Sequence, residues 1–115
     1  MLNYAPHIRN FEKMDHINKV ITLFDQQQYQ AALDEITLTQ ESGVESFELY
    51  LYQGRIYKKM GKYGDAINAL NKAKSLAPTD PRPDSEIGLI NSILQITNNF
   101  YYENPYTDLD LIEGL

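Results

Sequence analysis

The chain repeats itself along its length, and the period of this repeat constrains its fold more than any other feature of the 115-residue sequence. Shifting the sequence by 34 positions places similar residues over one another: Tyr29 and Tyr63, Ala32 and Ala66, Ile36 and Leu70, Thr39 and Ala73, Gly54 and Gly88. Periods of this length are typical of chains that stack one supersecondary unit on the next. We place the units at residues 13–46 and 47–80, with a partial unit from 81.

Each full unit has the pattern of two helices. In the second unit the apolar residues recur at helical spacing in two groups, which are Leu49, Tyr50, Ile56, Tyr57 and Met60, then Tyr63, Ala66, Ile67, Leu70 and Ala73. Between these groups lies the turn signal Gly61-Lys62, whereas the first unit has Gln26-Gln27-Gln28 there and no glycine. The sequence therefore predicts an all-α chain built from antiparallel helix pairs.

The second unit resembles the tetratricopeptide repeat family. The residues that stand at the family's spacing are Tyr50, Gly54, Tyr57, Gly61, Tyr63, Ala66, Leu70, Ala73 and Pro78. Small residues at 54 and 66 let two helices approach closely, and the bulky residues fill the sides of that contact. The resemblance implies a tetratricopeptide-like α-solenoid, a right-handed superhelix whose concave inner wall binds other molecules.

The units on either side depart from this pattern. The first has His16 in place of the bulky residue and Val20 in place of the glycine. The third keeps Gly88 but has Asp84 and Asn91 where bulky residues belong, and no second helix follows it in the pattern. We expect the third unit to be a capping helix that buries six aliphatic residues: Ile87, Leu89, Ile90, Ile93, Leu94 and Ile96.

These assignments divide the chain into three parts. An N-terminal extension covers residues 1–12. The repeat domain covers 13–99 and ends with the capping helix over 81–99. An acidic tail with aromatic and aliphatic residues covers 100–115.

Composition excludes several classes of function. Without Cys the chain has no disulfide, no thiolate zinc site and no Cys nucleophile, which is compatible with a reducing, cytoplasmic setting. A net charge of −6 argues against nucleic acid as a partner. No stretch approaches the ~20 apolar residues of a membrane span. Neither His has a second metal ligand at a suitable spacing, and no catalytic motif is present, so we predict no enzyme, no metal and no cofactor.

The charge is concentrated at one end. Residues 1–82 sum to zero, so the whole net charge of −6 belongs to residues 83–115, which have no basic residue. One interpretation is a solvated acidic end that keeps the protein soluble. The other is that the acidic end meets a basic cluster, for which the candidates are Arg55, Lys58, Lys59 and Lys62.

The family resemblance also implies which residues form the inner wall. Besides Met14, Asn18, Glu48 and Glu86, it places there the candidate peptide-binding residues Ile17, Ile21, Phe24, Leu51, Tyr52, Arg55, Lys58, Lys59, Arg82 and Leu89. Independently of the family, the apolar residues of the first helix span nearly half its circumference, whereas one partner helix needs a stripe of only about 100°. Either the N-terminal residues, including Tyr4, Ile8 and Phe11, fold back over the excess, or an apolar patch stays exposed for a ligand or a second subunit.

The sequence thus predicts a non-enzymatic adaptor that binds a peptide or protein segment on its concave face, with a preference for acidic and apolar segments. The alternative is a self-associating module, such as a homodimer, in which residues 100–115 fill the chain's own groove or a neighbour's. The tail could also pack beside the capping helix or stay disordered.

Overall fold

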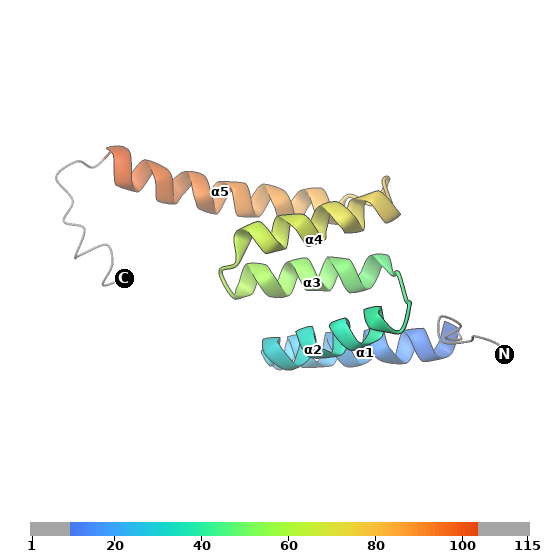
Figure 1. Ribbon diagram of the computed structural model, residues 1–115. Helices are drawn as coiled ribbons and strands as arrows, with labels where there is room; N and C mark the ends of the chain where they lie inside the picture. Colours follow the sequence, from blue (N-terminus) through green and yellow to red (C-terminus); the bar gives the residue numbers. More distant parts are fainter. Residues whose placement is uncertain (1–9, 104–115) are drawn as a thin grey trace.

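In the computed structural model the backbone is described over residues 10–103 and the side chains over residues 12–98. The described backbone consists of five α-helices and contains no strand (Figure 1); the helices are α1 (Asn10–Asp25), α2 (Tyr29–Glu41), α3 (Phe47–Lys59), α4 (Tyr63–Leu76) and α5 (Arg82–Glu103). Consecutive helices pack against each other, so the predicted all-α class of helix-pair repeats is confirmed. The first helix begins at Asn10 rather than near residue 13, and α5 runs past the predicted end at 99. The proposed tail residues 104–115 lie outside the described residues.

The turns inside the two units are copies of each other, at positions that the repeat makes equivalent. Gln28 N–H donates to Leu23 O and Lys62 N–H donates to Tyr57 O, both at 2.8 Å. The preceding residue is left-handed in each turn, with φ of 63° at Gln27 and 78° at Gly61. The first unit therefore forms the same turn as the second with Gln27 in place of a glycine, because the helices on both sides determine where the chain must reverse.

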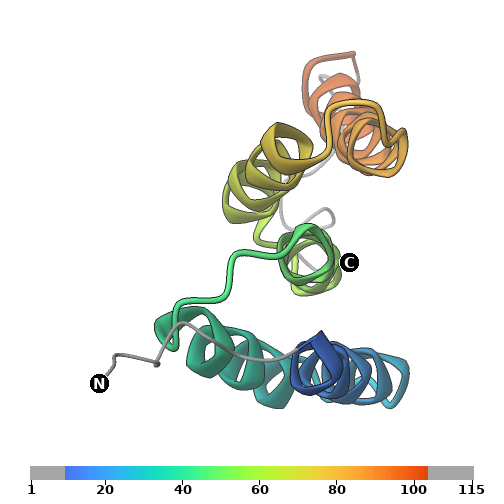
Figure 2. The same ribbon diagram turned by 90° about the vertical axis from the view of Figure 1, so that its right-hand side faces the viewer.

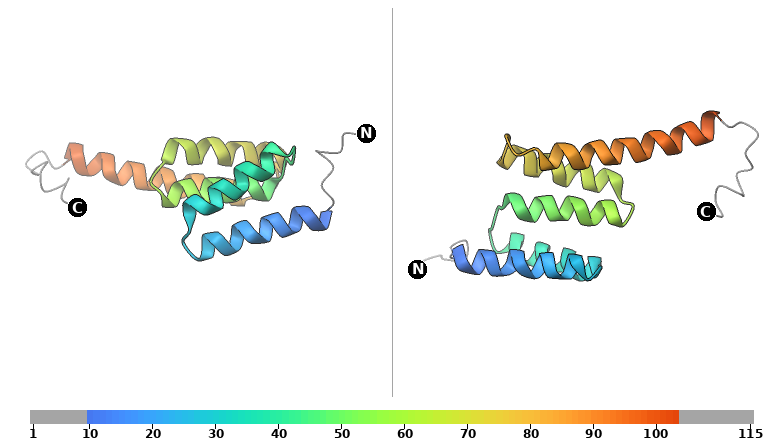
Figure 3. Two further views of the ribbon diagram at one scale, coloured as in Figure 1. Left: turned by 60° about the horizontal axis from the view of Figure 1, so that its bottom comes forward. Right: turned by 180° about the vertical axis from the view of Figure 1, so that it is seen from behind.

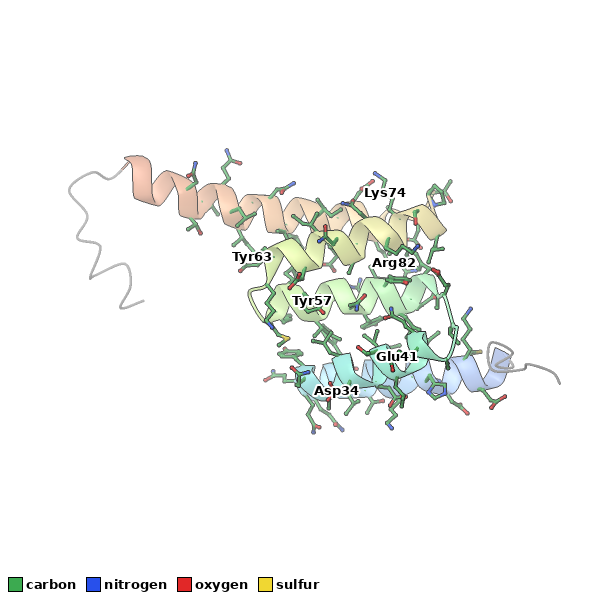
Figure 4. All side chains as sticks on the ribbon, in the orientation of Figure 1. Asp34, Glu41, Tyr57, Tyr63, Lys74 and Arg82 are labelled. Carbon is green, nitrogen blue, oxygen red and sulfur yellow. The ribbon has the colours of Figure 1, made fainter. Side chains whose placement is uncertain are left out.

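Helix α3 lies at the centre of the molecule and separates two apolar clusters. The first cluster joins α1, α2 and α3, and its buried residues are Val20, Ala32, Leu33, Ile36, Val44, Leu49 and Ile56. The second joins α3, α4 and α5 through Leu51, Ala66, Leu70, Ala73 and Ile90. Tyr57, in the last turn of α3, packs against both clusters (Figure 4).

The two helix pairs differ in how closely they pack. A Cβ on Gly54 would lie 2.5 Å from Leu70 Cγ, so α3 and α4 approach as closely as the glycine allows. At the equivalent place in the first unit stands Val20, which is buried, and α1 and α2 share a smaller contact than α3 and α4. The larger side chain holds the helices of the first pair further apart.

Helix α5 extends beyond the helices it packs on. Its first turn contains Pro83, which is buried, and Asp80 accepts a hydrogen bond from the Arg82 N–H at 3.0 Å. Figures 1 and 3 show its C-terminal half running past the end of α4. The expectation that α5 buries six aliphatic residues was wrong: Ile90 is buried and Ile87 is half-buried, but Leu89, Ile93, Leu94 and Ile96 are exposed. Leu89 is exposed because it lies on a different face of α5 from Ile87 and Ile90, which pack on the repeats. Ile93, Leu94 and Ile96 are exposed because no helix of the described chain covers them.

Candidate functional site

Helices α1, α3 and α5 line one side of the molecule and α2 and α4 the other. Figure 2 shows this arrangement end-on, with α3 set back between α1 and α5. The recessed side is therefore the concave face, and α3 forms its floor. This arrangement places the first helix of every unit on one wall.

The concave face contains an open pocket of about 490 Å³ between α1 and the start of α3. Its lining residues are Lys13, Met14, Ile17 and Asn18 from α1 and Glu48 from α3. Met14 is 61% exposed, and Ile17 packs against the first apolar cluster from a half-buried position. The pocket thus combines an apolar surface with a rim of opposite charges and one amide. Such a site suits an apolar side chain whose neighbouring backbone needs polar contacts.

An aromatic cluster continues the wall from the pocket toward the middle of the molecule. The rings of Phe24 and Tyr52 meet edge to face with centroids 5.5 Å apart, and Phe24 lies 5.8 Å from Tyr29. The Arg55 guanidinium lies 5.2 Å from the centroid of the Tyr52 ring. Ile21 is half-buried on α1, the helix that carries Phe24. Mutual contact holds the aromatic side chains in place, which reduces the entropy that a ligand must remove on binding.

Glu86 of α5 pairs with two of the four residues of the predicted basic cluster. Arg55 Nε donates to Glu86 Oε2 at 2.7 Å, and Lys58 Nζ donates to the other oxygen of the same carboxylate. Burial alone would raise the pKa of Glu86, but the hydrogen bonds from Lys58 and Arg55 outweigh it and the pKa is lowered. One acidic residue of the segment 83–115, Glu86, therefore contacts two members of the predicted basic cluster, Arg55 and Lys58.

The wall keeps a net positive charge in spite of Glu86. Lys59 is exposed and has no ion-pair partner among the described residues. With Lys13, Arg55 and Lys58 it gives four positive charges against the two negative charges of Glu48 and Glu86. The wall is thus cationic on a chain whose net charge is −6.

Three of the predicted peptide-binding residues do not lie in the centre of the concave wall. The assignment of Leu51 to the binding surface needs correction, because its side chain is fully buried in the second apolar cluster. Arg82 lies at the edge of the concave wall (Figure 4). Its Cζ is 5.0 Å from the centroid of the Phe47 ring, and its Nη2 is 2.8 Å from Asp80 Oδ2. Its hydrogen bonds lower the pKa of Asp80 to about 2. Leu89 is exposed on α5, away from the pocket.

His16 has a structural partner. Its Nδ1 lies 2.8 Å from Glu35 Oε2, and Lys19 Nζ lies 3.2 Å from Glu35 Oε1. Burial would raise the pKa of Glu35, but the hydrogen bonds from His16 and Lys19 lower it. These contacts tie α1 to α2. The part of the chain that the structure describes holds no cluster of His, Asp and Glu able to bind a metal, and none of its helices is long and apolar enough to cross a membrane.

The five packed helices define an all-helical repeat protein. Residues 47–80 match the family model described as Tetratricopeptide repeat, and these are the residues of the second predicted unit. The match covers this one segment, and the five-helix architecture of the described chain is consistent with a tetratricopeptide-like repeat protein. Repeats of this family generally mediate protein–protein interactions without catalysis. Searches of the curated proteins and of the solved structures gave no significant match.

Proposed function

We propose that this protein is a non-enzymatic adaptor that binds a peptide or protein segment on the concave face. The observation that carries the proposal is the 490 Å³ pocket at the first unit, which offers the exposed side chain of Met14 within reach of charged and amide groups. The preformed aromatic cluster beside the pocket extends the binding surface along α1 and α3.

The chemistry of the wall defines the segment that it would bind. An apolar side chain would occupy the pocket, since Met14 and Ile17 supply its apolar surface. Acidic residues further along the segment would meet Lys59 and the Arg55–Lys58–Glu86 group, which together retain positive charge. Because exposed charges act mainly on the rate of encounter, the acidic preference should weaken with salt while the apolar anchor should not.

Selection of peptides tests the proposal without a known partner. A random library of short peptides is displayed on phage and enriched against the immobilised full chain, and the affinity of the enriched peptides is measured by fluorescence anisotropy. The informative variant is Met14→Glu. Its matched control is Leu38→Glu on α2, because both wild-type side chains are 61% exposed and Leu38 does not line the pocket.

We expect Met14→Glu to weaken binding at least about tenfold and Leu38→Glu to change it less than about twofold, because only the first places a charge in the apolar pocket. Lys59→Glu should weaken acidic peptides several-fold at low salt and much less at high salt. If the enriched peptides bind Met14→Glu as tightly as the wild type, or if no peptide is enriched above background, a binding site on the concave face is refuted.

A further inference from the structure

Helix α5 carries an apolar stripe that no part of the described chain covers. Leu89 is 54% exposed, Ile93 38% and Ile96 68%. Turns of an α-helix advance by about 3.6 residues, so positions 89, 93 and 96 lie on one face. Ile87 and Ile90 lie on a different face of α5. Ile90 is a buried member of the second apolar cluster, and Ile87 packs against that cluster. The stripe is therefore additional to the surface that attaches α5 to the repeats.

The spacing of the stripe is that of a helix–helix seam. Leu89, Ile93 and Ile96 are separated by four and then three positions, and Phe100 continues the sequence pattern after four more. Alternation of three and four is the pattern by which two helices pack side by side along a/d positions. The part of α5 that projects past α4 is short, and a short isolated helix has only marginal stability in water unless another helix packs against it.

The charge distribution favours a particular partner. No charged residue occurs between Glu86 and Glu103, although the chain has a net charge of −6 and residues 83–115 contain all of it. Residues 91–98 are all exposed and all uncharged. A basic or acidic partner would find no complementary charge along this surface. A second copy of the chain could approach here without the repulsion that its acidic residues would cause elsewhere.

We infer that two copies of this chain associate through their α5 helices, packed antiparallel about a twofold axis between Ile93 and Ile96. The 4-3-4 spacing of positions 89, 93, 96 and 100 reads the same in both directions, as an isologous contact requires. In this register Ile93 of one copy meets Ile96 of the other. Because α5 projects past α4 (Figure 3), this arrangement would place the two repeat bodies at opposite ends of the helix pair. This inference does not depend on the proposed peptide site.

Sedimentation velocity of the full chain tests the association. Since the contact is small, we expect the average mass to rise from the monomer value of 13.3 kDa toward twice that value over concentrations of about 10–500 μM. Ile96→Glu should keep the mass at the monomer value throughout, because it places a charge in the seam on both sides of the axis. Leu38→Glu alters an equally accessible side chain on α2 and should leave the association unchanged. Circular dichroism verifies that each variant remains helical.

Two further measurements separate this arrangement from others. The natural chain has no Cys, so a mixture of Ile93→Cys and Ile96→Cys copies should form the mixed disulfide in preference to either symmetric one if the helices are antiparallel. Leu111→Glu should leave the association of the two copies unchanged. A wild type that keeps the monomer mass at every concentration, or an association that survives Ile96→Glu, overturns the inference. Association abolished by Leu111→Glu and not by Ile96→Glu would overturn it too, and would assign the contact to residues 104–115 instead.

Discussion

Gly54 and Gly88 are equivalent in the repeat, yet the structure predicts opposite effects for the same substitution. A Cβ at position 54 would lie 2.5 Å from Leu70 Cγ, 2.6 Å from Leu70 Cδ2 and 3.3 Å from the Ala66 carbonyl oxygen. A Cβ at position 88 would have no atom within 4 Å under the same test. The comparison of Gly54→Ala with Gly88→Ala therefore isolates close helix packing from the intrinsic cost of a helical glycine.

The magnitudes follow from two contributions. Replacing Gly by Ala inside a helix stabilises it by about 1 kcal/mol, and this gain is common to both variants. At position 54 the new methyl group meets Leu70, which is fully buried, so it incurs an overpacking cost of about 1–3 kcal/mol. We expect Gly88→Ala to stabilise by about 1 kcal/mol and Gly54→Ala to destabilise by about 1 kcal/mol.

Thermal and urea unfolding followed by circular dichroism at the helix band measures both effects. For a domain of this size 1 kcal/mol corresponds to about 4–8 °C, so the two melting temperatures should differ by about 8–16 °C. Gly64→Ala is a further control within α4, because a Cβ there also has no atom within 4 Å. If Gly54→Ala and Gly88→Ala shift the melting temperature equally and in the same direction, α3 and α4 do not approach as closely as described.

Two other predictions concern single contacts. Gln27→Gly should stabilise the protein by about 0.5–1 kcal/mol, since it removes a left-handed conformation from a residue with a Cβ and adds some freedom to the unfolded chain. The reverse change, Gly61→Gln, should cost a similar amount in urea unfolding, and a stabilising Gly61→Gln would contradict the reasoning. The folded-state pKa of Glu86 is lowered from 4.5, so its pairing stabilises the protein above pH 4.5 and is lost as the pH falls through the folded value. Glu86→Gln should therefore cost about 1–2 kcal/mol at pH 7 and progressively less below pH 4.5; a cost that does not change with pH in urea unfolding would contradict this assignment.

The sequence alone determined the elements and their order. The repeat period located both helix pairs, and the spacing of Tyr50, Gly54, Ala66 and Leu70 identified the close contact between α3 and α4. These features are local, or repeat at a fixed interval, so they can be read from one chain. The resemblance to the repeat family also placed Ile17, Phe24 and Tyr52 on the inner wall, and the structure packs all three against the first apolar cluster.

Only the tertiary structure decided which of these surfaces are covered and which charges are free. Leu51 and Tyr52 are adjacent in α3, but one is fully buried in the second apolar cluster and the other lies on the concave wall. The sequence left open whether the acidic residues after position 82 contact the basic cluster, and only the packing of α5 brings Glu86 to Arg55 and Lys58. The apolar residues of α5 fit a buried helix by composition, yet Leu89 and Ile96 are exposed because the described chain offers them no neighbour. Helical spacing specifies which residues share a face, whereas burial and charge pairing depend on what packs against that face.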